Sequence, residues 1–339
     1  MYVILALLLL GVLIIAHEFG HYIAARLCGI DVVEFAMGMG PLLLKWTNKR
    51  GTQFSLRLLP IGGFCQFYGE EDGKSDERAF TRQPVWKRFV TVLSGPMMNF
   101  VIAVLVIVLY MSALGLLAVV PKVAEVEPAA EASGLRVGDE IVAIDGEAVS
   151  DSNQIAQMIG QSQGEKVSMR VRRDGEEIEL SFTPFYDEEL GRYRLGMVFA
   201  QERVRVSLLE SIPFSVRYNI ESVAAIVDAL KGMVFRGEGV DQVTGPVGTV
   251  YAISSETQSG GIDIYLQLLA LISVNLGVMN LLPIPGLDGS KLLFLLAEKL
   301  RRRPIRQELE GMINAGGLLL LMGLMIVLTY KDIMQIFVR

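Results

Sequence analysis

The 339-residue sequence is poor in cysteine, histidine and charge. It contains two Cys and two His, and 20% of its residues are charged, against about 25% in ordinary soluble domains. The net charge of −6 gives no support for binding to nucleic acid. Because 52% of the residues are hydrophobic, the composition excludes a purely soluble enzyme and a disordered chain.

The apolar residues are concentrated in four long runs without charge, at 2–16, 89–120, 264–287 and 313–330. A membrane-spanning helix needs about 20 mostly apolar residues. We therefore predict four transmembrane helices, at residues 2–24, 92–119, 265–287 and 313–336. No basic residue precedes the first run and no small-residue cleavage site follows it. We therefore expect a retained span rather than a cleaved signal peptide.

The loops between these runs differ in charge. Residues 26–90 and 289–310 carry more Lys and Arg than Asp and Glu, whereas residues 121–205 carry ten basic and seventeen acidic residues. Because basic loops stay cytoplasmic, we expect both termini and the middle region to be extracytoplasmic. Cys28 and Cys65 then lie on the reducing side of the membrane, where a disulfide is not expected.

The middle region, residues 121–205, has the pattern of one small soluble domain that mixes strands and helices. Apolar residues alternate at 167–172 and at 176–182, with a turn signal between them, which predicts a β-hairpin. Residues 155–159 suit a short helix. We therefore treat the region as a compact insert between two membrane halves.

Segment 207–236 repeats apolar residues every three or four positions. This spacing predicts an amphipathic helix that lies on the membrane or packs against the other spans. The chain thus divides into four parts. They are an N-terminal membrane half (1–120), the soluble insert (121–205), an amphipathic and connecting segment (206–250), and a C-terminal membrane half (251–339).

Both histidines belong to the sequence His17-Glu18-Phe19-Gly20-His21. On a helix, positions i and i+4 lie on one face, so the two imidazoles can bind one zinc ion while the Glu acts as a general base. A charged residue inside a membrane span costs about 2.5–3.5 kcal/mol on insertion scales. A polar cluster that holds helices together is the alternative, but this cost favours a catalytic role for Glu18.

Catalytic zinc usually has three protein ligands, so one ligand is missing. The candidates are Cys28, Cys65 and a distant carboxylate. Cys28 follows His21 by two helical turns and is too far along the helix axis. We favour Asp288, the acid that ends the third apolar run, where two prolines should unwind the helix beside a cavity. An ordinary acid at a helix end is the alternative.

Three motifs occur in order along the chain. They are the His17–His21 sequence, Ser94-Gly95-Pro96-Met97-Met98-Asn99, and the segment from Asn280 through Pro283 and Pro285 to Leu287-Asp288-Gly289. Together they resemble the site-2 protease family of intramembrane zinc metalloproteases, peptidase family M50. The resemblance is greatest to its bacterial branch, the anti-sigma-factor-cleaving regulator of sigma-E proteases. It implies that His17, His21 and Asp288 bind zinc and that Glu18 is the general base.

The resemblance also suggests how substrate is held. Residues 41–68 are unusually apolar for a cytoplasmic loop, and their pattern predicts a β-hairpin. In the family, the matching hairpin enters the membrane, and its edge could pair with an unwound substrate. An ordinary surface hairpin is the alternative. We name Gly62, Gly63, Phe64, Asn99 and Asn280 as residues that contact substrate, with helix packing as the alternative for Asn280.

Residues 128–146 resemble the circularly permuted PDZ domain of the same family. The expected peptide-binding loop, near Val119–Val126, lacks the glycine that is common in peptide-binding PDZ loops. We therefore expect the domain to exclude substrates with a bulky outer part rather than to capture a C-terminal peptide.

The sequence thus predicts a polytopic α-helical membrane protein with four transmembrane helices, a membrane-associated β-hairpin and one inserted PDZ-like α+β domain. We expect a zinc-dependent endopeptidase of the bacterial cytoplasmic (inner) membrane, with its active site toward the cytoplasmic side. Its partners would be the lipid bilayer and a single-pass substrate already cut by another protease, and not nucleic acid. The alternatives are a non-catalytic membrane scaffold and a metal transporter, although further intramembrane acids for a transport path are lacking.

Overall fold

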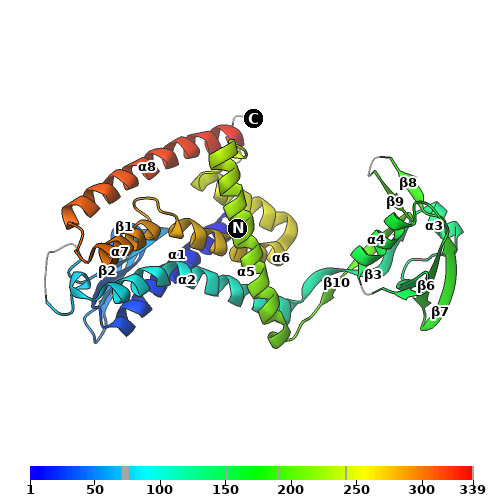
Figure 1. Ribbon diagram of the computed structural model, residues 1–339, viewed down its shortest axis with the longest axis horizontal. Helices are drawn as coiled ribbons and strands as arrows, with labels where there is room; N and C mark the ends of the chain where they lie inside the picture. Colours follow the sequence, from blue (N-terminus) through cyan, green and yellow to red (C-terminus); the bar gives the residue numbers. More distant parts are fainter. Residues whose placement is uncertain (71–75, 150, 189–190, 241–242, 338–339) are drawn as a thin grey trace. The chain divides into compact units, whose positions relative to one another are not determined.

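The computed structural model describes residues 1–70, 76–149, 151–188, 191–240 and 243–337. The chain forms two compact units (Figure 1). Unit 1 consists of Met1–Tyr110 and Leu208–Arg339, and unit 2, Met111–Ser207, is inserted between its two parts. The insert expected at 121–205 lies within unit 2.

Four helices of unit 1 are long and apolar enough to cross a membrane, and each of them contains most of one predicted span. They are α1 (Tyr2–Cys28), α2 (Val85–Leu109), α6 (Pro246–Leu281) and α8 (Gln307–Phe337). The second span ends before the predicted residue 119, because a π-helical turn follows α2 and strand β3 begins at Leu116. The third helix, α6, ends at Leu281 instead of residue 287, because Pro283 disfavours helical geometry at Leu282, the residue before it. The protein is therefore a multi-pass membrane protein.

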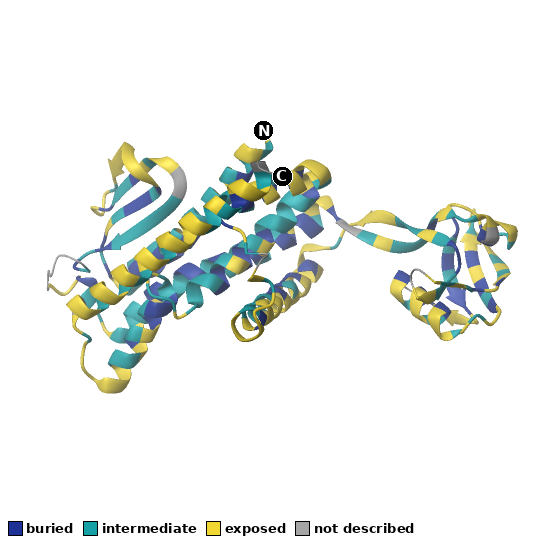
Figure 2. Ribbon diagram, turned by 90° about the horizontal axis from the view of Figure 1, so that it is seen from above, coloured by how far each residue is buried: buried dark blue, intermediate teal, exposed yellow. Residues whose placement is uncertain are grey.

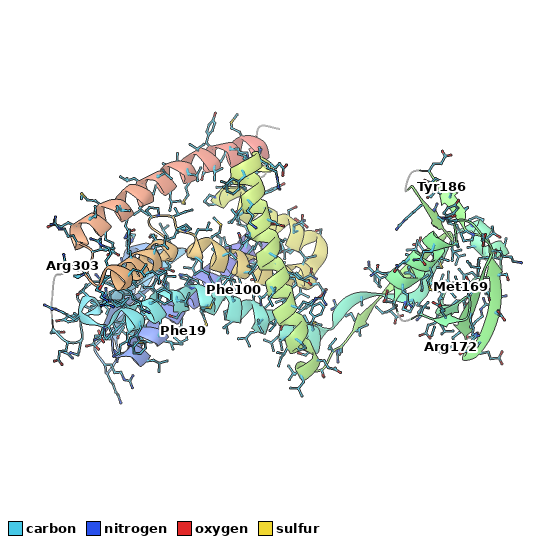
Figure 3. All side chains as sticks on the ribbon, in the orientation of Figure 1. Phe19, Phe100, Met169, Arg172, Tyr186 and Arg303 are labelled. Carbon is cyan, nitrogen blue, oxygen red and sulfur yellow. The ribbon has the colours of Figure 1, made fainter. Side chains whose placement is uncertain are left out.

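Small residues allow α1, α2 and α6 to approach one another closely, as is usual for helices in membranes. A Cβ atom added at Gly20 of α1 would lie 2.3 Å from the carbonyl oxygen of Ser94 in α2. One added at Gly277 of α6 would lie 2.9 Å from the ring of Phe100, a residue of α2 that is labelled in Figure 3. These three spans form the packed core of unit 1, where buried and exposed stretches alternate along the helices (Figure 2).

Helix α8 is packed differently from the other spans. In the most apolar 18-residue segment of α8, no residue is buried. In the corresponding segments of α1, α2 and α6, 28–33% of the residues are buried. One buried residue of α8 is Asp332, which is 1% exposed. The Asp332 carboxylate accepts hydrogen bonds from the backbone N–H groups of Gly245 (3.1 Å) and Gly248 (2.7 Å). Both N–H groups lie at the N-terminus of α6, which begins at Pro246. The Asp332 carboxylate of α8 therefore stabilises this helix end.

Strands β1 (Val32–Thr47) and β2 (Gln53–Phe67) form a larger sheet than the hairpin predicted at 41–68. Residues 53–57 pair with 42–47, as in that hairpin, but residues 34–37 pair both with 53–56 and with 63–66. Gly38 and Gly40 have φ values of +87° and +84°, which allow β1 to bend between its two halves. The segment 63–66 therefore lies beside 34–37 instead of extending the hairpin.

The segment predicted as an amphipathic helix forms α5 (Leu208–Lys231), followed by a π-helical turn (Gly232–Arg236). Its buried residues are polar, namely Ser211, Ser215, Asn219 and Ser222. Its apolar residues, such as Ile212 and Ile220, are exposed. The helix packs against α2 and α6. The structure therefore agrees with the prediction that this helix packs against the other spans. Helix α7 (Asp288–Arg301) and a short 3-10 helix, η1 (Phe80–Arg82), also belong to unit 1.

Unit 2 is built on a sheet with the strand order β10-β3-β4-β6-β7, in which β5 also pairs with β4. The strands are β3 (Leu116–Val126), β4 (Glu140–Ile144), β5 (Glu147–Ala148), β6 (Val167–Arg173), β7 (Glu176–Phe182) and β10 (Met197–Val204), and β8 (Phe185–Asp187) pairs with β9 (Arg192–Arg194). Helices α3 (Pro128–Ala132) and α4 (Ser152–Gln161) join them. The predicted hairpin is confirmed by the pairing of β6 with β7. An apolar core that includes Met169, labelled in Figure 3, holds the unit together.

Candidate metal centre

The two histidines lie on the side of α1 that faces the protein. The buried residues of this helix form a stripe with mostly three- and four-residue steps: Ala6, Leu9, Leu13, His17, Gly20, His21, Ala24 and Ala25. Larger apolar residues such as Leu8 and Val12 are exposed on the other side. The i, i+4 spacing predicted from the sequence therefore brings both imidazoles to one buried surface, with their Nε2 atoms 3.2 Å apart.

Asp288 reaches the same place from the other end of the sequence. Helix α6 ends at Leu281 and α7 begins at Asp288. The connection turns at Gly286, whose φ is +94°, a conformation that favours glycine. A Cβ atom at Gly289 would lie 2.1 Å from the carbonyl oxygen of Leu282. This close turn carries the Asp288 carboxylate, with Oδ2 3.0 Å from His17 Nε2 and 3.2 Å from His21 Nε2.

The donor atoms fit a metal ion of the zinc type. Tetrahedral ligands about 2.0–2.1 Å from zinc are about 3.3 Å from one another, and the three donor–donor distances here are 3.0–3.2 Å. Two imidazoles and one carboxylate also match the ligand set of catalytic zinc sites, which leave one position open. Within the described residues, His17, His21 and Asp288 are the one group of three His, Cys, Asp or Glu side chains placed closely enough to hold a metal.

The structure separates the three candidates for the missing ligand. Neither cysteine belongs to the cluster that contains both histidines and Asp288. Asp288 is therefore the residue that completes the set.

The outer nitrogen of each imidazole is held by α2. His21 Nδ1 lies 2.9 Å from the carbonyl oxygen of Thr91, to which it can donate its proton. Donation by Nδ1 leaves a lone pair on Nε2, the atom that points at Asp288. Such second contacts are typical of metal-binding histidines. Thr91 was not among the predicted site residues, because its contact is made by a backbone oxygen, which no side-chain motif reveals.

Asn99 plays the corresponding part for His17. Its side chain is fully buried and its amide lies 3.2 Å from His17 Nδ1. With the amide nitrogen on this side, Asn99 Oδ1 has no hydrogen-bond partner within the described structure. A half-turn of the amide places Oδ1 on Nδ1–H, which removes the unpaired oxygen and leaves His17 Nε2 with a free lone pair. This orientation fits a metal at Nε2; the predicted contact of Asn99 with substrate stays a prediction.

Gly95 provides the space that the ligands need. A Cβ atom at this position would lie 2.2 Å from His21 Nε2, well inside any allowed contact. Ser94, the preceding residue, donates from its hydroxyl to the carbonyl oxygens of Gly20 (3.0 Å) and Thr91 (2.7 Å). The sequence Ser94–Asn99 therefore fits α2 directly against the metal-binding turn of α1.

Glu18 lies beside the sheet of unit 1. A Cβ atom at Gly63 would be 3.3 Å from Glu18 Cγ and 3.0 Å from the carbonyl oxygen of Ala36. The structure therefore brings Gly63, one of the predicted substrate contacts, to the predicted general base. Phe64 instead packs beneath Arg57, whose guanidinium carbon lies 5.0 Å from the ring centre.

The other predicted contacts are not drawn into the centre. Gly62 has a φ of +88° and faces Met39. Asn280 is half-buried near the end of α6, and its side chain has no hydrogen bond to another described residue. The substrate roles of Gly62, Gly63, Phe64 and Asn280 stay predictions.

Comparison with known proteins agrees with this geometry. The chain matches peptidase family M50 over residues 5–324. A protein of Agrobacterium fabrum named as a zinc metalloprotease is 33% identical, with 98% of this chain and 95% of the relative covered. A relative of the same designation in Clostridium perfringens is 34% identical, with 98% of both chains covered. A third, from Clostridium acetobutylicum, is 33% identical, with 98% of this chain and 97% of the relative covered.

One solved structure that is similar to part of the chain is a PDZ domain from an SdrC-like protein of Listeria monocytogenes. It covers 25% of this chain and 92% of that chain, with 20% identity and a TM-score of 0.23, a score too low to carry an argument about unit 2. The family match and the near full-length relatives carry the conclusion instead. The chain belongs to peptidase family M50, the site-2 protease family of metalloendopeptidases.

Proposed function

We propose that the protein is a zinc-dependent intramembrane endopeptidase that cleaves single-pass membrane proteins within or near the membrane. One observation carries the proposal: His17, His21 and Asp288 converge on one point, and Glu18 is adjacent, inside a helix apolar enough to span a membrane. The names of the relatives, zinc metalloproteases, support the choice of metal.

The residues of the centre have separate tasks. A zinc ion held by His17, His21 and Asp288 would supply Lewis-acid chemistry, which activates water and polarises the scissile carbonyl. The Glu18 carboxylate accepts a proton from the attacking water and passes it to the leaving amine. Thr91 and Asn99 keep the imidazoles in the orientation and tautomer that metal binding requires. The apolar spans exclude bulk water, which strengthens these interactions.

A transmembrane substrate must expose its backbone before it can be cut, because a helix keeps its carbonyl groups in internal hydrogen bonds. The segment that contains Gly63 offers backbone groups close to Glu18. We infer that an unwound substrate pairs with this segment as an added strand, so that its scissile bond lies at the metal.

We place the protein in a bacterial cytoplasmic (inner) membrane, with both termini and unit 2 outside the cytoplasm. The basic residues of 26–90 and 289–310 support this orientation. In this arrangement unit 2, a PDZ-like domain in our interpretation, excludes substrates whose outer part is still large. The substrate is then a membrane protein already cut by another protease, such as an anti-sigma factor or a remnant signal peptide.

The test is a Glu18→Gln variant with Glu256→Gln as its control, since Glu256 is an exposed acid on another span. We expect Glu18→Gln to abolish cleavage of a model single-pass substrate while the purified protein keeps one zinc ion. The control should cleave normally. Undiminished cleavage by Glu18→Gln would contradict the proposal, and a wild-type protein without stoichiometric zinc would favour a non-catalytic scaffold.

A further inference from the structure

Unit 1 contains a cavity of about 740 Å³ beside the metal centre, a volume in the range of about 300–1,000 Å³ that is typical of ligand pockets. Residues of α2, α7 and α8 and the segment before α2 line it. Its polar lining includes Glu70, Arg88, Lys291, Glu298, Glu310 and Asn314. Apolar residues such as Phe80 and Phe294 form part of the remaining wall.

The cavity shares a wall with the segment that carries the metal ligand Asp288. Lys291 lies three residues after Asp288 in α7. Asn314 of α8 accepts hydrogen bonds at Oδ1 from the Gly286 backbone N–H (3.4 Å) and from the Ser290 hydroxyl (3.3 Å). A group bound in the cavity would therefore lie against the segment that carries Asp288, and none of the three metal ligands lines the cavity.

The charges in the cavity do not balance. Arg88 makes two hydrogen bonds to the Glu298 carboxylate, and Lys291 Nζ lies 2.7 Å from Glu70 Oε1. Both cations are thus paired. Glu310 is half-buried, and among the described residues no Lys, Arg or His group lies within ion-pair distance of it. A carboxylate held partly away from water is stabilised by a cation beside it.

We propose that this cavity binds a Lys or Arg side chain of the substrate, with Glu310 as the partner of the cationic group. This inference rests on the proposed function. The cytoplasmic flank of a transmembrane segment is rich in Lys and Arg. The basic loop 289–310 assigns the cavity to that side. A long basic side chain also suits the mixed wall, because its carbon stem packs on apolar residues while its head stays polar.

The test compares two single-pass substrates that differ only by Lys or Gln at the cytoplasmic flank. Wild-type protein in detergent or vesicles should have a KM about fivefold lower for the Lys substrate, a factor within the range of a partly exposed ion pair. Glu310→Gln should bring the ratio of the two KM values close to one. Glu310→Lys should reverse the preference, so that the Gln substrate has the lower KM. Glu308→Gln, at an exposed acid of the same helix that does not line the cavity, should keep the wild-type ratio.

Equal KM values in the wild type, or an unchanged ratio in Glu310→Gln, would overturn this inference alone, because cleavage itself would still support the protease. Failure of the wild type to cut either substrate would instead overturn the proposed function and this inference with it.

Discussion

The two units of the protein differ in how many polar side chains they bury. In unit 2 the buried cluster is apolar, and the buried polar residues among those described are Asp139 and Ser152. In unit 1 the buried polar residues include His17, His21, Thr91, Asn99, Ser273 and Asp332, whereas large apolar residues such as Leu319 and Ile326 are exposed.

Their stability therefore has different origins. Burial of apolar surface holds unit 2 together, as in a soluble domain. In unit 1 the surroundings are as apolar as the side chains, so close packing and polar contacts hold the helices together. The metal centre belongs to the unit that buries more polar groups. A substitution of the same kind should therefore act differently in the two units.

The largest contrast is expected between two Gly→Ala substitutions. In Gly95→Ala the new Cβ would lie 2.2 Å from His21 Nε2, so the ligand must move, and we expect zinc content to fall below stoichiometry and cleavage to fall at least about 100-fold. In Gly160→Ala, on α4 of unit 2, the Cβ meets open space. There we expect wild-type cleavage and α4 stabilised by up to about 1 kcal/mol. Zinc analysis and hydrogen exchange of the full chain measure both effects; a fully zinc-loaded, active Gly95→Ala protein would contradict the packing described.

A smaller loss is expected when Asn99 is replaced. Asn99→Leu keeps the size of the side chain but removes the acceptor for His17 Nδ1–H, so we expect zinc affinity to fall about 10–100-fold. Asn99→Asp keeps an acceptor oxygen and should recover most of the affinity. Competition with a chelator measures the binding. Equal affinities for Leu and Asp variants would show that Asn99 has only a packing role.

The smallest effect on the metal centre is expected from a substitution whose consequences are confined to unit 2. Asp139 is 1% exposed and accepts hydrogen bonds from Arg173 Nε (2.7 Å) and the Arg136 backbone N–H (2.8 Å). Burial alone raises the pKa of its carboxyl group, but these hydrogen bonds and the two arginine charges lower it further than burial raises it, so the net pKa is lowered. The ion pair therefore stabilises the fold above the unfolded pKa of about 3.9, and this stability is lost as the pH falls through the lower folded value.

Asp139→Asn should accordingly lower the free energy of unfolding of unit 2 by roughly 3 kcal/mol at pH 7 and flatten its loss below about pH 4. Hydrogen exchange of β6 and β7 amides in the full chain measures this change. Zinc content should stay at the wild-type value. A variant as stable as the wild type at pH 7 would show that Arg173 and Asp139 add little.

The parts of the site that the sequence reveals are those encoded by local spacing. The four-residue spacing of His17 and His21 suffices to place both on one side of a helix. The prolines before Asp288 indicate where the helix ends, so that this acid can turn toward the histidines. The sequence does not reveal that the Thr91 backbone and the Asn99 amide support the imidazoles, because this depends on how α2 is rotated against α1.

The sheet of unit 1 illustrates the same limit. The alternation in 41–68 predicted a hairpin, but residues 34–37 lie between two other segments of the chain. That pairing depends on a bend at Gly38 and Gly40, which the alternation does not encode. The cavity at Glu310 likewise combines segments more than 200 residues apart, such as Arg88 and Glu298.

The placement of the ligands along the chain has a consequence for biosynthesis. Two ligands lie one helical turn apart in the first span, and the third is separated from them by almost the whole chain. The hydrogen bonds of α1 alone fix the first two. The complete set exists only when the start of α7, a helix that packs against α2 and α6, has reached α1. A metal that binds the complete set and not the partial one stabilises the assembled protein by mass action. The complete centre therefore forms only after Asp288 has reached the two histidines of α1.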